Sequence, residues 1–170
     1  MGSEMCIRDS SGFEQLSQQN LVGWSIGDQD SKSFQFDSRN PKTGINSLLI
    51  KNEASESVWV RSNPFTAPTT GRLSVSVWLR TDSKDSQPPL RISVEGASIG
   101  SGYYRFGSVG SLSTDVATNQ ITTEWKRFGI HFDDLPIEEV GNVRIGFDMM
   151  GEGTVWIDEC EVYDLSLIHI

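Results

Sequence analysis

The sequence is poor in the residues from which disulfide frameworks, zinc sites and catalytic triads are built. It has two cysteines and two histidines among its 170 residues. A disulfide framework needs several paired cysteines, a structural zinc site needs four ligands, and a Ser-His-Asp triad needs a positioned histidine. We therefore expect no enzyme of these kinds. His131 lies in an alternating segment and is expected on the face of a sheet.

The sequence also lacks long apolar runs and an excess of basic residues. No run is long enough to span a bilayer. The 14 lysine and arginine residues stand against 23 aspartate and glutamate residues, which gives a formal net charge of −9. Such a chain has no positive footprint for nucleic acid. We expect neither nucleic acid nor a membrane as a partner, and the net charge favours a monomer.

The two ends of the sequence are related to each other as DNA. Residues 5–10 can be encoded by ATG-TGT-ATA-AGA-GAC-AG, and the reverse complement of that stretch encodes residues 165–170. Both ends resemble translated sequencing-adapter DNA. We therefore expect residues 1–10 and 165–170 to be adapter-derived extensions that pack loosely or not at all. Residues 11–164 are then one domain, a fragment cut from something larger.

Setting residues 1–10 aside also removes one of the two cysteines. Cys6 falls in that extension, so we expect no disulfide framework in residues 11–164. An isolated cysteine in an alternating segment behaves as a small apolar residue. We expect Cys160 to be a buried, inert thiol.

Period-two alternation of apolar and polar residues dominates the rest of the sequence, and helical periodicity is nearly absent. Turn-forming clusters rich in Pro, Gly, Asn and Asp separate the alternating segments. The expected strands are residues 47–52, 57–63, 72–80, 90–96, 125–132, 142–150 and 154–162, with a weaker one at 33–38. This pattern predicts an all-β fold, a two-sheet antiparallel sandwich or barrel. The glycine-rich stretch 96–107 is expected to be a flexible hairpin region without the context of a phosphate loop.

Alternation also assigns the faces of three strands. Residues 72–80, 90–96 and 142–150 each have an apolar row that faces a core and a polar row that faces outward. The outward rows carry one large aromatic residue, Trp78, beside small serine and glycine side chains. We expect a shallow trough around Trp78.

Several motifs in a fixed order resemble a known group of domains. They are "GFE", "GW", "KTGINSLLI", "LSVSVWLR", "TTEWKRFGIHF" and "VRIGFDMMGEGTVWIDECEV". This set resembles the jelly-roll, galactose-binding-like carbohydrate-binding modules of families four, nine and twenty-two, over essentially all of residues 11–164. The resemblance implies a non-catalytic module that binds polysaccharide or glycan chains on a concave sheet. It also implies a secreted or cell-surface parent protein in which the module is tethered to other domains.

The resemblance further implies how the strands pair. It places residues 46–51, 142–150, 71–80 and 89–96 in one sheet, which carries the ligand. It places residues 33–37, 154–163, 57–62 and 124–132 in the other.

Sugar recognition needs an aromatic ring for the C–H face of the sugar and planar polar groups for its hydroxyls. The residues expected to bind carbohydrate are Trp78, Arg80, Arg91, Glu95, Tyr103, Tyr104, Arg144 and Asp148, with Phe106 walling one end. The other tryptophans, Trp24, Trp59, Trp125 and Trp156, are expected to be structural, with Trp59 and Trp156 stacked on neighbouring strands.

Three alternatives stay open. The charged residues can instead form ion pairs on a solvated sheet face. The domain can be a structural or adhesive module of a surface protein, without a sugar ligand, and a covered Trp78 would favour that interpretation. A small hydrolase would require a deep pocket that holds Glu95 and Asp148 together.

The resemblance also implies a structural calcium ion where the first strand meets the last. The matching positions are Glu14 and Asp158, with Lys42 through its carbonyl and Asn46 through its side chain. Carboxylate and carbonyl oxygens are the ligands that calcium prefers. The alternative is that Glu14 and Asp158 bond local backbone and counter-charges.

Overall fold

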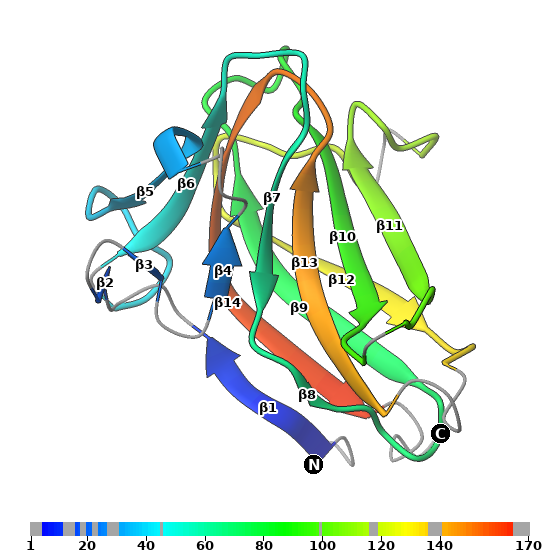
Figure 1. Ribbon diagram of the computed structural model, residues 1–170. Coiled ribbons are helices and arrows are strands. Elements are labelled where there is room, and N and C mark those ends of the chain that lie inside the picture. The colour runs from blue at the N-terminus through cyan, green and yellow to red at the C-terminus, as the bar shows by residue number, and fades with distance from the viewer. Residues whose placement is uncertain are drawn as a thin grey trace.

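The chain folds into two antiparallel β-sheets packed face to face, as a computed structural model shows (Figure 1). The structure describes residues 5–11, 16–17, 20–21, 24–26, 31–44, 46–98, 100–115, 119–135 and 141–164. The sheet nearer the viewer in Figure 1 is called the front sheet, and the other the back sheet. Among the described residues, no helix is long and apolar enough to cross a membrane.

The front sheet has five strands in one path and a sixth at its side. Their order is β11 (Tyr104–Gly110), β10 (Pro89–Gly96), β13 (Asn142–Met149), β7 (Val58–Ser62) and β4 (Trp24–Ile26). The short strand β8 (Phe65–Thr66) pairs with the start of β13.

The back sheet is built in the same way around its longest strand. Its order is β12 (Lys126–Phe132), β9 (Leu73–Arg80), β14 (Gly153–Asp164), β6 (Ser47–Asn52) and β5 (Phe34–Asp37), and β1 (Met5–Ser11) pairs with the second half of β14. Two small elements precede β5: the strand pair β2 (Leu16–Ser17) and β3 (Asn20–Leu21), and the 3₁₀ turn η1 (Ser31–Ser33).

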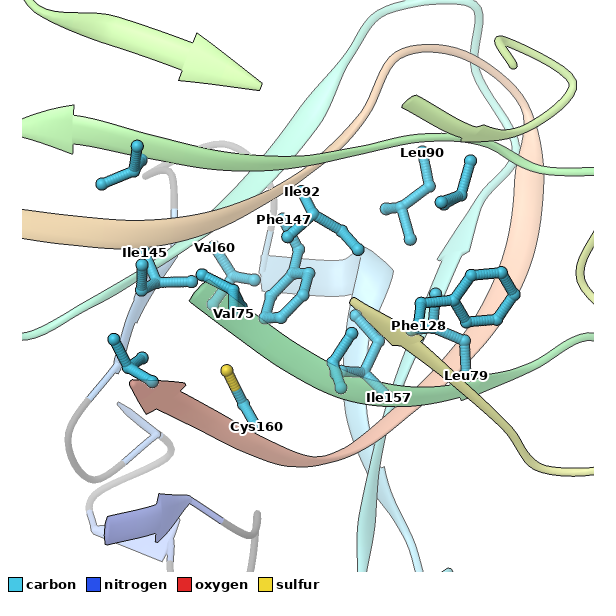
Figure 2. Close-up of a cluster of buried hydrophobic side chains, with 14 of the residues drawn as sticks. Val60, Val75, Leu79, Leu90, Ile92, Phe128, Ile145, Phe147, Ile157 and Cys160 are labelled. Atoms are coloured by element: carbon cyan, nitrogen blue, oxygen red, sulfur yellow. The ribbon is translucent and has the colours of Figure 1, made fainter. Parts of the chain in front are cut away.

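The core lies between the two sheets and is made by the apolar rows that alternation predicts. Leu79 and Ile157 of the back sheet and Ile92 and Phe147 of the front sheet are fully buried in it (Figure 2). The Phe147 ring packs on Trp24, with 5.8 Å between ring centroids. The predicted all-β jelly-roll sandwich is therefore confirmed.

The expected strands are found, but the predicted distribution of strands between the sheets is wrong. β6 and β9 flank β14 in the back sheet, whereas they were expected beside β13 and β10. β7 pairs with β13 in the front sheet, whereas it was expected beside β14. Alternation fixes which side chains of one strand share a face, but it contains no information about which strand lies alongside. The predicted ligand face is therefore divided between opposite sides of the molecule.

Three strands of the front sheet were not predicted, the short strands β4 and β8 and the seven-residue strand β11. The first four residues of β11, 104–107, fall in the stretch expected to be a flexible hairpin, and β11 pairs with β10 over seven residue pairs. Its inward row includes Gly107, where an added Cβ would lie 2.6 Å from the Ile130 side chain of the back sheet. A glycine is required here because the second sheet approaches closely, and its presence hides the alternation of the strand.

A β-bulge divides β14 into two halves. The register with β9 shifts between Asp158 and Glu161, and Glu159 adopts a positive φ of 52°. The extra residue restores the inward row after the bulge. Cys160 is consequently buried, 2% exposed, at the core side (Figure 2), as predicted.

The terminal segments differ from the expectation at one end. Residues 5–11 form β1 and pair with β14, although loose packing was predicted for residues 1–10. β14 extends beyond the end of β6, so its second half offers backbone groups that β1 pairs with. Residues 165–170 lie outside the described part of the chain.

Candidate functional site

The outer surface of the front sheet brings together polar and aromatic side chains from four strands. The cross-strand register places Asp148 between Arg91 and Trp59, and Gly146 between Ser93 and Arg61. This surface, called the front face, consists of Trp59 and Arg61 of β7, Arg91, Ser93 and Glu95 of β10, Tyr104 and Phe106 of β11, and Arg144, Gly146 and Asp148 of β13.

Arg61 is the centre of an ion-pair network on this face. Its Nε lies 2.9 Å from Glu95 Oε1, and its Nη1 donates to Asp148 Oδ1. Nη1 also donates to the Val60 carbonyl at 3.2 Å. The side chains of Arg61 and Asp148 are 12% and 7% exposed. One guanidinium thus links β7, β10 and β13 and fixes both carboxylates.

The Arg61 side chain can lie across the sheet because residue 146 has no side chain. An added Cβ on Gly146 would come within 2.6 Å of Ser93 Oγ and closer still to Arg61 Nη1. Glycine at this position therefore makes the space that the guanidinium occupies.

Tyr104 extends the network to β11. Its hydroxyl donates to Asp148 Oδ2 at 2.5 Å. Burial raises the pKa of Tyr104, the hydrogen bond to Asp148 raises it further, and Arg91 acts in the opposite direction. The Tyr104 ring also packs against Phe106, with 5.7 Å between centroids.

Two large apolar side chains remain exposed on the front face. Trp59 is 37% exposed and Phe106 is 43% exposed. They stand on β7 and β11, which β13 and β10 separate. The Arg61 guanidinium lies 5.1 Å from the Trp59 ring centroid, and that of Arg91 lies 3.9 Å from the Phe106 ring centroid. Each exposed ring therefore has a guanidinium group within cation–π range.

Three residues of the predicted ligand set lie elsewhere. Trp78 and Arg80 belong to β9 of the back sheet, and Tyr103 is buried in the core at 9% exposure. The Tyr103 hydroxyl donates to Asp134 at 3.1 Å, and burial raises the pKa of Tyr103. The other five, Arg91, Glu95, Tyr104, Arg144 and Asp148, share the front face.

Trp78 is not the exposed ring that the sequence predicted. It is half-buried on the back sheet, and Lys42 Nζ lies 4.0 Å from its ring centroid. The partial cover by Lys42 removes the main argument for Trp78 as a sugar platform.

Arg80 lies between two indole rings of the back sheet. Its guanidinium is 4.1 Å from the ring centroid of Trp156 and 5.2 Å from that of Trp125. Trp156 Nε1 donates to Asp37 at 2.8 Å. Arg80, Trp156 and Asp37 border a hollow of about 490 Å³ that Arg39, Leu49 and Lys51 also line. Trp156 is 9% exposed and lies on the opposite sheet from Trp59, so the predicted stacking of the two rings is wrong.

Trp59, Arg61 and Gly146 are the site residues that the sequence analysis missed. A signal for the first two was present: Val58 and Val60 form the inward row of β7, so alternation sends Trp59 and Arg61 outward. The sheet assignment then put them on the wrong side of the molecule.

The residues proposed for calcium lie near the bulge of β14. The Asp158 carboxylate is fully buried, which raises its pKa to about 6. It accepts hydrogen bonds from the backbone N–H groups of Lys42 at 3.1 Å, Thr43 at 3.2 Å and Glu159 at 2.9 Å. The loop thus offers N–H donors to this carboxylate, as in the alternative of local backbone bonding.

The side chains around Asp158 can be compared with those of a typical metal-binding cluster. The described residues contain no group of three or more histidine, cysteine, aspartate or glutamate side chains placed to hold an ion. Asn46 is half-buried near this loop, and Glu14 lies outside the described residues. Calcium therefore stays a prediction.

Comparison with known proteins finds similarity in structure but not in sequence. No family model matches the sequence, and no curated protein matches it. The CBM22-1 xylan-binding domain of Paenibacillus barcinonensis Xyn10C is similar in structure, with a TM-score of 0.62 and 12% identity over 96% of this chain and 97% of that chain. TmCBM61, solved in complex with β-1,4-galactotriose, has a TM-score of 0.55 and 17% identity over 92% and 99% of the two chains.

A domain with catalytic activity has a similar fold as well. The enzymatically active domain of tailspike protein 4 from bacteriophage CBA120 matches with a TM-score of 0.58 and 9% identity, over 91% of this chain and 21% of that chain. At such identities the likeness establishes the fold alone. The function must be argued from the front face.

Proposed function

We propose that the chain is a non-catalytic carbohydrate-binding module that holds a polysaccharide or glycan chain on the front face. The observation that carries the proposal is the pair of exposed aromatic rings, Trp59 and Phe106, on one polar sheet face. Solvent-exposed aromatic side chains gathered on a single face are typical of a binding surface. The structural likeness to a xylan-binding domain and to a module bound to a galactose oligosaccharide supports the proposal.

The rings and the ion-pair network have complementary roles in this proposal. Trp59 and Phe106 stack on the C–H faces of two sugar units, and the arginines between them donate to sugar hydroxyls. The bonds from Arg61 to Glu95 and Asp148 hold the polar groups in place before the ligand arrives. Such preorganisation reduces the entropy that binding costs.

The same network argues against glycoside hydrolysis on this face. Hydrolysis by paired carboxylates requires a sugar, or a sugar and a water molecule, between the two groups. The Arg61 guanidinium occupies the space between Glu95 and Asp148 and contacts both. The alternative of a small hydrolase would first have to displace Arg61.

Affinity electrophoresis in gels that contain soluble xylan or β-1,4-galactan tests the proposal. We expect at least one polysaccharide to retard the wild type, and Trp59→Ala and Phe106→Ala each to weaken the retardation about tenfold. Trp78→Ala is the matched control, because it removes an indole from the back sheet.

Three results of this experiment would count against the proposal. Loss of binding in Trp78→Ala but not in Trp59→Ala would place the site on the back sheet. Equal binding by all three variants would show that none of the three aromatic rings contributes to carbohydrate binding. If no polysaccharide retards the wild type, a structural or adhesive module becomes the better interpretation.

We also propose a secreted or cell-surface parent protein that carries further domains. The proposal follows from the kind of ligand, since polysaccharide chains long enough to span the front face are found outside the cell. Expression of the chain fused to an export signal, followed by assay of glycan binding in the culture medium, tests whether it folds there.

A further inference from the structure

The front face contains more positive charge than its own carboxylates neutralise. It has three arginines, Arg61, Arg91 and Arg144, and two acids, Glu95 and Asp148. Arg61 pairs with both acids. Within the described part of the chain, neither Arg91 nor Arg144 forms an ion pair.

The excess of positive charge on the front face is not a consequence of the overall composition of the protein. The chain has a formal net charge of −9, so a randomly chosen surface of this size is expected to be acidic. A cationic surface on an acidic protein attracts anions to that place and repels them elsewhere.

Unpartnered polar atoms lie on the same surface. Arg91 Nε and Ser93 Oγ are buried, and neither has a hydrogen-bond partner among the described residues. They are two residues apart on β10 and therefore share a face. A buried donor without an acceptor is costly, so a small movement of either side chain that brings it to an acceptor on a ligand would be favourable.

Arg91 is also held in a fixed plane. Its guanidinium lies 3.9 Å from the ring centroid of the exposed Phe106. A planar guanidinium fixed by stacking matches a carboxylate through two parallel hydrogen bonds. The two carboxylates of the face, Glu95 and Asp148, are already engaged by Arg61. The face thus offers donors in excess of acceptors, whereas a neutral sugar presents hydroxyls that need both.

From this geometry we infer that the front face selects an acidic glycan, one with uronic acid units, whose carboxylate binds Arg91 beside Phe106. This inference rests on the proposed function and names the class of sugar. Arg144 lies four residues along the strands from the Arg91 row, about 13 Å away, and is therefore off the path of a chain that crosses the strands between Trp59 and Phe106.

Isothermal titration with matched pairs of polymers tests the inference. The probes are polygalacturonate with its methyl-esterified form, and glucuronoxylan with its carboxyl-reduced form. We expect at least one acidic polymer to bind tenfold or more tightly than its neutral partner, with an affinity that falls as sodium chloride is added.

The variants locate the effect. Arg91→Gln is expected to weaken binding of the acidic polymer about tenfold to a hundredfold and to change the neutral form little. Arg91→Lys keeps the charge without the planar fork and is expected to recover only part of the loss. Arg72→Gln, an exposed arginine just before β9, is the control for charge alone and should bind as the wild type does. Circular dichroism establishes that each variant is folded.

The outcomes separate the inference from the proposed function. Equal or tighter binding of the neutral forms overturns the selection for acid and leaves glycan binding intact. Failure of every polymer, acidic or neutral, overturns both. Dextran sulfate, a polyanion without uronic acid, distinguishes a specific carboxylate site from general electrostatic attraction. The inference is overturned if dextran sulfate binds as tightly as the acidic glycan and if Arg72→Gln and Arg91→Gln weaken that binding equally.

Discussion

Arg61 and Gly146 depend on each other on the front face. The guanidinium of Arg61 reaches Asp148 only by passing over residue 146, where an added Cβ would crowd Ser93 Oγ at 2.6 Å. The pair therefore acts as one unit that positions the carboxylates of the face. A change at the glycine is expected to act on ligand binding through the arginine.

Gly146→Ala tests this dependence. The new methyl group displaces Arg61, so we expect glycan affinity to fall about tenfold and the free energy of unfolding to fall by about 1–3 kcal/mol. Calorimetric titration and urea denaturation measure the two effects. Gly129→Ala is the control, because the nearest atom to its added Cβ is the Val75 carbonyl oxygen at 4.0 Å. Similar behaviour of the two variants would refute the role of Gly146.

On the back sheet, the ionised form of Asp37 is held by several hydrogen bonds. Asp37 is 6% exposed, accepts a hydrogen bond from Trp156 Nε1 at 2.8 Å and pairs with Arg39. The hydrogen bond from Arg39 holds the pKa of Asp37 well below its ordinary value of 3.8. Because the folded pKa is depressed, the charged form contributes stability above the unfolded pKa, and that stability is lost as pH falls.

The loss should be visible in Asp37→Asn. The difference in free energy of unfolding between wild type and Asp37→Asn is expected to be largest near pH 7 and to shrink between about pH 4 and pH 2. Urea denaturation across this range measures it. Asp85→Asn, in an exposed turn, should lie within about 0.5 kcal/mol of the wild type at pH 7. A difference for Asp37→Asn that does not vary with pH would contradict the assignment.

At the scale of elements, the sequence predicts strands well and their neighbours poorly. Alternation located β6, β9, β10, β12, β13 and β14 nearly to their ends because each keeps an apolar row toward one core. It could not identify β11, where Gly107 replaces an apolar side chain under Ile130. It also could not tell that β7 rather than β9 lies beside β13, since pairing is decided by contacts remote in sequence. Because β7 and β9 were assigned to the wrong sheets, Trp78 rather than Trp59 was predicted to be the aromatic residue that stacks on the sugar.

The bulge in β14 allows a test of how one residue sets the faces of a strand. Deleting Glu159 removes the extra residue, so Cys160 and Val162 would turn out of the core. We expect the free energy of unfolding to fall by more than about 3 kcal/mol, from the loss of two buried apolar side chains. Glu159→Gly keeps the chain length and suits the positive φ, so it should stay within about 1 kcal/mol of the wild type. Thermal melting followed by near-ultraviolet circular dichroism compares them. A deletion variant that melts like the wild type would show that the bulge is dispensable.

At the scale of the whole molecule, calcium is the open prediction. A ligand that binds only the folded state stabilises it, by about 2.7 kcal/mol when its concentration is 100 times its Kd. We expect the melting temperature to rise with added calcium, to fall with chelator, and to respond less in Asp158→Asn. The buried Asp158 carboxylate hydrogen-bonds the loop of Lys42 and Thr43 to β14, the central strand of the back sheet. Calcium binding at this carboxylate is therefore expected to change the stability of the back sheet. An unchanged melting temperature at saturating calcium would remove the ion from consideration.

The positions of Trp59 and Phe106 have a consequence for the polymer rather than for the protein. Three strand spacings separate β7 from β11, so a line between the rings crosses the strands over roughly 14 Å. A polysaccharide along that line runs across the sheet and leaves it over one edge in each direction. Such a module binds an internal segment of the polysaccharide and does not require a free end of the polymer. Occupancy of a long polysaccharide should then scale with contour length, with neighbouring molecules excluding one another from overlapping segments.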